Sequence, residues 1–275
     1  MIESFGATHV NMFTWFRRRF LELGKSATHV DMFTWIRKPV PAFTLAEVLV
    51  TLGIIGVVAA MTLPTVIDNS RNKQLETALK RSYSVLSQAL EMYYAEEGVK
   101  LTPKNCGVLK LKPILMKYLH TAKDCYLWDN ATKTKRICVP DPNSLNEEQK
   151  ANGYIKYKTL NGTSDIGMYL LDDGQFVLND SSLVLLENSG NMLIISVDVN
   201  GYNKRPNRLG IDLFMFQINN EGTLLPMGVK GTYLYSAPTD PYDIYCSWRA
   251  QSSMNGAGCT YKALYEKDYF KNLPR

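Results

Sequence analysis

The feature that most constrains this chain is an uncharged run of twenty residues, from Val48 to Ile67, which follows directly on an acid, Glu47. At a rise of about 1.5 Å per residue, an α-helix of that length crosses the hydrocarbon core of a bilayer. The run therefore predicts a membrane-spanning helix. A carboxylate is costly near the centre of a membrane and less so near its edge, so Glu47 either lies at headgroup level or has a specific task.

The residues in front of the run form a motif. Residues 42–47 read Ala-Phe-Thr-Leu-Ala-Glu, and the basic pair Arg37-Lys38 precedes them. This arrangement resembles the processing site of type IV prepilins and of the pseudopilins of type II secretion systems. The resemblance implies that a prepilin peptidase cuts between Ala42 and Phe43 and methylates the new amine of Phe43. The family usually has Gly before the cut, where this chain has Ala42.

The same resemblance assigns a role to Glu47, which would be the fifth residue of the mature chain. Its carboxylate is expected to neutralise the Phe43 amine of a neighbouring subunit in a low-dielectric filament core, and so to set the axial register. Gly53, Gly56 and Pro64 lower helix propensity or remove a backbone hydrogen bond. They are expected to soften the helix during assembly.

The domain organisation follows from the run. Residues 1–42 are expected to be a removed leader, with Met1 and Met32 both candidate starts, and residues 43–67 a transmembrane and filament-core helix. Residues 68–98 continue as an amphipathic helix, in which 68–70 either cap a new helix or lie within a continuous one. The apolar positions that recur at threes and fours are Leu75, Ala78, Leu79, Ser82, Leu86, Ala89, Leu90 and Tyr93. Gly98 is expected to end the helix.

Residues 99–275 are expected to form one globular head. Short runs rich in β-branched and aromatic residues predict an antiparallel sheet of four to six strands. The predicted strands are 154–159, 168–171, 175–178, 192–197, 213–218 and 223–225, with hairpin turns at 172–174 and 219–222. A long helix followed by such a sheet is an α+β fold, which is also the architecture that the pilin resemblance implies.

Charge gives the expected topology. Residues 1–42 hold six Lys or Arg and three acids, which favours a cytoplasmic N-terminus and an exported head. Together with the prepilin resemblance, this orientation implies a single-pass protein of the inner (cytoplasmic) membrane, and afterwards a pilus or pseudopilus. The rest of the chain holds 25 basic and 23 acidic residues, a net charge of +2. This balance gives no argument for nucleic-acid binding.

All five cysteines lie after the apolar run: Cys106, Cys125, Cys138, Cys246 and Cys259. An exported head permits disulfides. The pairs 125/138 and 246/259 each enclose twelve residues and are the candidates for bonds, although sequence alone does not fix the connectivity or the fate of Cys106. Zinc is a poor alternative, because His120 is the only histidine after the expected cut and no C-x2-C pair occurs.

Two stretches of the head are candidates for binding. Asp198, Asn200, Asn203 and Asp212 concentrate oxygen ligands of the kind that suit Ca²⁺. The loop does not match the EF-hand pattern, but it is similar in kind to a calcium loop that some pseudopilins carry late in the head. The alternative is a turn-rich loop whose Asx side chains satisfy its own backbone.

The second stretch, residues 246–259, resembles the disulfide-bounded C-terminal loop of many pilins, where a receptor or a neighbouring subunit binds. Trp248 and Arg249 are its candidate contacts, or else packing residues. Motifs typical of enzymes are missing from the sequence: it has no G-x-S-x-G, no H-E-x-x-H and no G-x-G-x-x-G after a strand. We therefore expect no catalytic residues and no enzyme.

The expected function is that of a structural subunit of a type IV pilus or of a type II secretion pseudopilus, without a cofactor other than the candidate Ca²⁺. Its expected partners are copies of itself, other pilin-like subunits, the prepilin peptidase, the inner-membrane assembly platform and membrane lipid. The alternative is a minor pilin or a membrane-anchored binding module whose head recognises a surface, a ligand or DNA. Leader and helix are common to all of these systems, so the sequence does not separate them.

Overall fold

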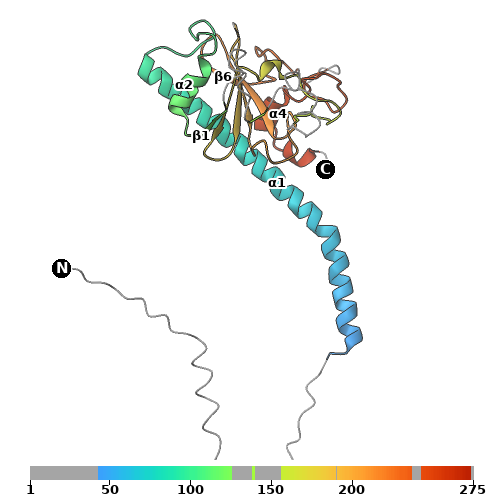
Figure 1. The fold of residues 1–275 in the computed structure, drawn as a ribbon. Helices are drawn as coiled ribbons and strands as arrows, with labels where there is room; N and C mark the ends of the chain where they lie inside the picture. The colour runs from blue at the N-terminus through green and yellow to red at the C-terminus, as the bar shows by residue number, and fades with distance from the viewer. Residues whose placement is uncertain (1–42, 126–137, 140–155, 190, 237–242, 274–275) are drawn as a thin grey trace, which may run out of the picture. The chain divides into compact units, whose positions relative to one another are not determined.

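The computed structural model describes residues 43–125, 138–139, 156–189, 191–236 and 243–273 (Figure 1). The chain divides into two units between Ile55 and Gly56, and each is described by itself. The expected leader, with Ala42, lies outside the described residues.

The first element is helix α1, Leu45–Glu97, of 53 residues. Gly53, Gly56 and Pro64 all lie within it, and it passes through residues 68–70 without a break. Of the two alternatives for that stretch, the continuous helix is therefore the one observed. The helix ends before Gly98, whose positive φ of 71° is the left-handed conformation that glycine adopts readily.

In the second unit, the later turns of α1 bury one face against the sheet. The buried residues are Leu75, Leu79, Ser82, Leu86, Ala89 and Leu90. Tyr83 stacks on Phe216 with ring centroids 5.6 Å apart, and the Asn72 side-chain amide donates to the carbonyl of Phe270 over 2.8 Å. The amphipathic pattern thus predicted the buried face correctly.

The described part of the head contains a six-stranded sheet whose spatial order is the chain order, with every neighbouring pair antiparallel. Its strands are β1 Thr121–Cys125, β2 Gly174–Leu178, β3 Leu183–Glu187, β4 Leu193–Asp198, β5 Leu213–Ile218 and β6 Leu224–Pro226. The α+β class predicted from the sequence is confirmed. The shorter elements are α2 Leu111–Tyr118, η2 Met168–Leu170, α4 Cys259–Tyr265 and η3 Phe270–Asn272.

Both faces of the sheet are covered. Alternate residues of β5 divide between two hydrophobic clusters: Phe214 and Phe216 join the cluster that contains the buried face of α1. Leu213 and Met215 join a second cluster, which includes residues of η2 and of the segment that precedes α4. Strands buried on both faces read as continuous apolar runs instead of alternating patterns.

That double burial explains one error in the predicted strands. β3, Leu-Val-Leu-Leu-Glu, was not predicted, because it lacks the polar alternation of a half-exposed strand. β1 was also missed: it is a polar strand at the sheet edge, and only its last residue, Cys125, is buried. Conversely, the apolar residues 168–171 were predicted as a strand, but they contain η2. Short apolar runs do not distinguish these structures by pattern alone.

Two further expectations for this region need correction. Of the predicted strand 154–159, residues 156–159 are described, and they form only isolated bridges at Lys158. Residues 172 and 173 connect η2 to β2 and do not form a hairpin turn, whereas residues 219–222 join β5 to β6 as expected.

Two disulfides tie the head together: Cys125 is bonded to Cys138, and Cys246 to Cys259. These are the two pairs that the spacing offered as candidates. Cys106 is free and buried. Burial raises the pKa of its thiol to about 11, which makes it a poor nucleophile at neutral pH.

Candidate functional site

The first turn of α1 is closed by reciprocal hydrogen bonds between Thr44 and Glu47. The backbone N–H and the hydroxyl of Thr44 each donate to Oε2 of Glu47 over 2.8 Å. In return, the N–H of Glu47 donates to the Thr44 hydroxyl oxygen over 3.2 Å. This is a capping box, which satisfies backbone donors that an α-helix leaves unpaired at its start.

The capping box gives Glu47 a local task that the sequence interpretation overlooked. The signal was present, because Thr44-Leu45-Ala46-Glu47 in front of an apolar run fits the S/T-x-x-E pattern. Glu47 therefore has two explanations that do not exclude each other: it caps its own helix, and it can present a negative charge to a neighbouring chain. A substitution that keeps the cap and removes the charge can separate them.

The apolar segment on both sides of Glu47, from Phe43 to Ile67, exposes its apolar side chains. Phe43 is 87% exposed and Leu45 78%, and no residue of the most apolar 18-residue window of α1 is buried. Other exposed apolar residues of the segment are Leu49, Val50, Leu52, Ile54, Ile55, Val57, Val58, Met61, Leu63, Val66 and Ile67. By length and composition the helix can cross a membrane. A contiguous apolar surface of this kind requires lipid or other protein to cover it.

Residues 38–63 match the family model described as the prokaryotic N-terminal methylation motif. The chain carries the type IV pilin and pseudopilin signature. The match begins at Lys38 and covers the expected cleavage site, Glu47 and most of the apolar run, and it indicates a pilin-like precursor that prepilin peptidase processes. Neither the search of curated proteins nor the search of solved structures found a match.

In the head of this pilin-like chain, the candidate calcium loop contains a buried pair of acids. Asp198 and Asp212 are both fully buried. Asp198 accepts hydrogen bonds from the Tyr157 hydroxyl at 2.6 Å and from the N–H of Gly201 at 2.9 Å. Asp212 accepts from the N–H groups of Asn207 and Arg208, at 2.7 and 2.6 Å. Burial raises the pKa of both carboxyls, and the neighbouring Asp212 raises that of Asp198 further.

Two amide oxygens of the same loop lack hydrogen-bond partners among the described residues. They are Oδ1 of Asn200 and Oδ1 of Asn207, and Asn207 is only 8% exposed. The side-chain nitrogens of both residues donate to carbonyl oxygens within the loop. Asn203, in contrast, is exposed. The structure therefore brings together Asp198, Asn200 and Asp212 of the expected set, with Asn207 in place of Asn203.

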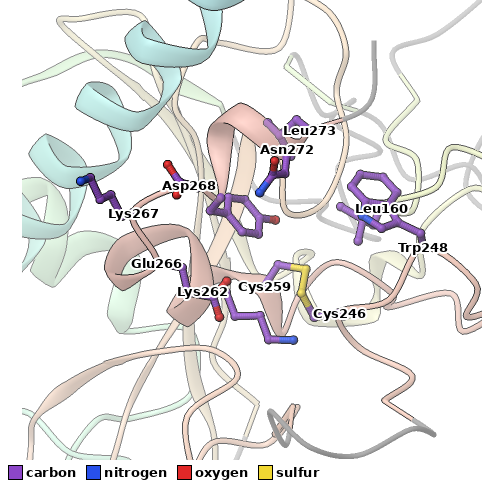
Figure 2. Close-up of a pocket in the computed structure, with 11 residues that line it drawn as sticks. Leu160, Cys246, Trp248, Cys259, Lys262, Glu266, Lys267, Asp268, Asn272 and Leu273 are labelled. Atoms are coloured by element: carbon purple, nitrogen blue, oxygen red, sulfur yellow. A yellow bond between two sulfur atoms is a disulfide. The ribbon is translucent and has the colours of Figure 1, made fainter.

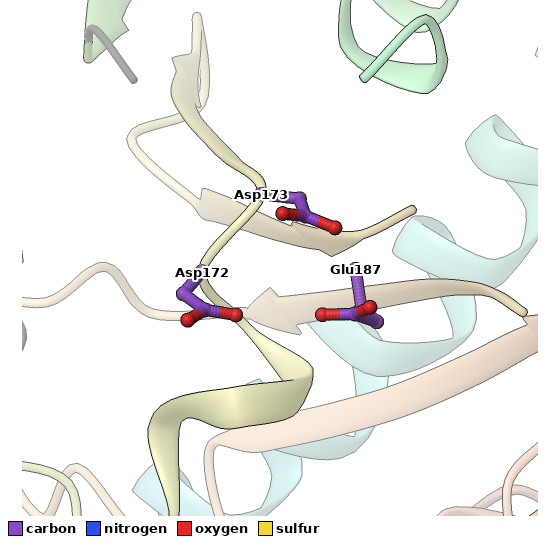
Figure 3. A group of neighbouring side chains, drawn as sticks. All are labelled: Asp172, Asp173 and Glu187. Atoms are coloured by element: carbon purple, nitrogen blue, oxygen red, sulfur yellow. The ribbon is translucent and has the colours of Figure 1, made fainter. Parts of the chain in front are cut away.

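A second group of acids lies near the start of β2. Ligand atoms of Asp172, Asp173 and Glu187 lie within 4.8 Å of one another (Figure 3). The described loop backbone engages two of these side chains: Asn188 N–H donates to Asp173 over 2.7 Å, and Ser189 N–H donates to Glu187 over 3.0 Å. These bonds account for Asp173 and Glu187 as part of the loop structure.

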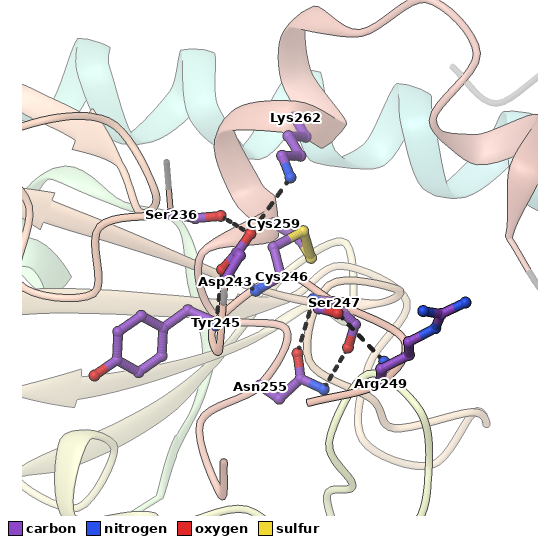
Figure 4. Close-up of polar contacts among 9 residues, drawn as sticks. All are labelled: Ser236, Asp243, Tyr245, Cys246, Ser247, Arg249, Asn255, Cys259 and Lys262. Carbon is purple, nitrogen blue, oxygen red and sulfur yellow. Dashed lines mark hydrogen bonds and ion pairs between the residues drawn. A yellow bond between two sulfur atoms is a disulfide. The ribbon is translucent and has the colours of Figure 1, made fainter. Parts of the chain in front are cut away.

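The loop between Cys246 and Cys259 is held by an internal clamp. The buried side chain of Asn255 donates to the carbonyls of Ser247 and Ala250, at 2.7 and 3.0 Å, and accepts from the Ser247 N–H at 3.1 Å (Figure 4). Ahead of the disulfide, Asp243 accepts from the N–H of Cys246 at 3.0 Å. The loop is thus fixed at both ends and across its middle.

The two expected contacts of this loop are placed differently. Trp248 is 44% exposed and lines a cavity of about 510 Å³ beside the disulfide (Figure 2). Arg249 is exposed and is not among the residues that line this cavity, and in Figure 4 its guanidinium points away from the Asn255 clamp. The cavity itself has no signal in the sequence, because its walls come from segments far apart in the chain.

Proposed function

We propose that this protein is a subunit of a type IV pilus or of a type II secretion pseudopilus, assembled through α1. The observation that carries the proposal is the combination of the methylation motif at residues 38–63 with an exposed apolar helix surface directly behind it. The motif implies assembly with other pilin subunits in general and supports a structural role. The extent of the apolar surface explains why such a subunit needs both a membrane and a filament.

In this proposal the apolar segment is used twice. Before assembly, it anchors the precursor in the inner membrane, with the basic leader in the cytoplasm and the head exported. The peptidase then frees the amine of Phe43, and the assembly platform transfers the subunit from lipid to filament. There, the exposed apolar side chains pack against those of neighbouring helices, and Glu47 pairs with the Phe43 amine of a neighbour. Gly53, Gly56 and Pro64 allow local unwinding where that packing requires it.

The experiment that tests this proposal is fractionation of cells that express the protein. Shearing releases surface filaments, and a major subunit dominates that fraction. A subunit of a secretion pseudopilus instead stays in the membrane fraction, and deletion of its gene abolishes protein export. If the protein is scarce in sheared filaments and its deletion changes neither piliation nor export, the structural role is refuted.

One observation favours a second function, that of a minor pilin or membrane-anchored binding module. The cavity beside Trp248 places an aromatic side chain next to several polar groups on a clamped loop, and convergent polar groups of this kind fix the orientation of a bound ligand. A binding module would be scarce among sheared filaments while binding of its ligand depends on it. DNA receives no support from the net charge of +2 beyond residue 42.

We also propose that the loop from Asp198 to Asp212 holds Ca²⁺. Burial raises the pKa of both carboxyls, and the neighbouring Asp212 raises that of Asp198 further. Together with two amide oxygens that lack partners among the described residues, they form a set of hard oxygen donors of the kind that calcium selects. Asp198, Asp212, Asn200 and Asn207 would hold the ion, which would neutralise the acid pair and fix the loop. Proton sharing between the two carboxyls is the alternative way to neutralise them.

Thermal unfolding with and without calcium distinguishes calcium binding from proton sharing between the two carboxyls. At pH 8 the full-length protein is expected to unfold at a higher temperature in millimolar CaCl₂ than in chelator, and Asp212→Asn is expected to abolish the difference. Asp180→Asn, which changes an acid of the loop between β2 and β3, is the matched control and keeps the calcium response. A melting temperature that does not respond to chelator removes the calcium proposal.

A further inference from the structure

The cavity beside the C-terminal disulfide combines an aromatic wall with polar side chains. Trp248 and Leu160 come from the loops, and Lys262, Glu266, Asp268 and Asn272 from α4 and the segment that follows it. Figure 2 shows the indole of Trp248 next to Leu160, with Lys262 and Glu266 beyond the disulfide. The volume of about 510 Å³ is within the usual range for sites that bind small ligands.

The backbone around Trp248 is held in place by hydrogen bonds. It lies between Ser247 and Ala250, whose carbonyls both accept from the Asn255 side chain, and the Ala250 carbonyl also accepts from Asn161 over 2.9 Å. The neighbouring disulfide holds the loop to the first turn of α4. An exposed indole on such a support offers a large flat surface, and little conformational entropy is lost when a ligand covers it.

The polar side chains argue against a polyanion. The cavity is lined by two lysines, Lys262 and Lys267, and by two acids, Glu266 and Asp268, so its formal charge is zero. Lys262 lies 3.5 Å from the carboxylate of Asp243, which further reduces its attraction for an anion. Nucleic-acid sites are in contrast strongly positive. The ammonium, carboxylate and amide groups instead offer donors and acceptors for a ligand with many hydroxyls.

We infer that this cavity binds a saccharide, with one sugar ring stacked on Trp248 and its hydroxyls bonded to Lys262, Glu266, Asp268 and Asn272. A pyranose ring has an apolar face of C–H groups and a rim of hydroxyls, which matches an aromatic wall beside neutral, mixed polar groups. The inference rests on the head acting as a binding module. It is independent of filament assembly, because all of these residues lie in the head.

The test uses the full-length protein in detergent, so assembly is not required. Saturation-transfer NMR is recorded with the methyl glycosides of glucose, galactose, mannose and N-acetylglucosamine, and a 20-base-pair DNA duplex is tested by fluorescence anisotropy. The variants are Trp248→Ala, Trp248→Phe and, as a matched control, Tyr233→Ala, which removes an exposed aromatic outside the cavity. Thermal unfolding shows whether each variant is folded.

At least one glycoside is expected to bind saturably. Loss of a central aromatic contact should weaken that binding by tenfold or more in folded Trp248→Ala, with partial recovery in Trp248→Phe and no change in Tyr233→Ala. The inference is overturned if none of the four glycosides binds, if Trp248→Ala binds as the wild type does, or if the duplex is the ligand that depends on Trp248. Filament yield from the same variants reports separately on the assembly proposal.

Discussion

Glu47→Gln is the substitution that separates the two tasks of Glu47. A glutamine side-chain oxygen can accept the same hydrogen bonds from the N–H and hydroxyl of Thr44, since Gln serves at this position of a capping box as Glu does. The substitution therefore keeps the start of α1 and removes the negative charge. The matched variant Thr44→Val does the reverse, because it removes the capping hydroxyl and leaves the charge in place.

The expected magnitudes differ. Loss of an N-terminal cap costs about 1 kcal/mol, or roughly a fivefold change in an equilibrium. Loss of one partner of a buried ion pair costs about 3–5 kcal/mol, because the other partner is left as an unpaired buried charge. In a filament core where the Phe43 amine depends on this carboxylate, the charge-free variant is expected to reduce the assembled fraction by a hundredfold or more. Thr44→Val is expected to reduce it by less than tenfold.

The assay measures sheared filaments, or crosslinked assemblies if the protein forms a pseudopilus, by immunoblot in cells that produce only the variant. The signal is divided by the amount of processed subunit in the membrane, so that poor expression or cleavage does not count as poor assembly. Near-normal assembly of Glu47→Gln would refute charge pairing. Near-normal assembly of Glu47→Gln together with a loss in Thr44→Val would show that Glu47 acts only as a helix cap.

Three further predictions concern the head. Without calcium, the melting temperature should fall as the pH rises from about 4 to about 8. Burial raises the pKa of Asp198 from about 3.9 in an unfolded chain to about 8, so the folded state binds protons more tightly. Asp198→Asn should flatten this fall in melting temperature, and an unchanged slope would contradict the argument. Replacing Cys246 and Cys259 together by serine should reduce the free energy of unfolding by about 2–4 kcal/mol in denaturant titrations, since the bond closes a short loop, and no loss would show that the loop needs no crosslink. Leu79→Ala, at a fully buried position of α1, should reduce the free energy of unfolding by about 2–5 kcal/mol in the same titration. The exposed control Thr77→Ala should reduce it by less than about 1 kcal/mol. Equal effects would mean that this face of α1 does not belong to the hydrophobic core.

The sequence was most informative where one physical demand dominates. The uncharged run predicted a membrane or filament helix from its length alone, and the spacing from Leu75 to Leu90 gave the buried face of α1, because an amphipathic helix has one period and one face to bury. The pilin signature depends on a few residues at fixed spacing, so it was recognisable without structure. The cysteine pairs were offered by spacing, but only the structure establishes the bonds.

The other features of the fold and of the candidate site depend on tertiary contacts, which the local sequence pattern does not encode. β3 was missed because both of its faces are buried, and residues 168–171 were misassigned because a short apolar run is compatible with a strand and with η2. The replacement of Asn203 by Asn207 beside the acid pair follows from the path of the loop. The Trp248 cavity likewise requires residues from three separate segments.

The most direct test of the central claim is the mass of the N-terminal peptide of the protein purified from membranes. Cleavage between Ala42 and Phe43 followed by methylation predicts a peptide that begins with N-methylphenylalanine at Phe43 and retains the whole apolar run. A chain that begins at Met1 or Met32, or one that begins beyond Ile67 after removal of the run, would contradict the account.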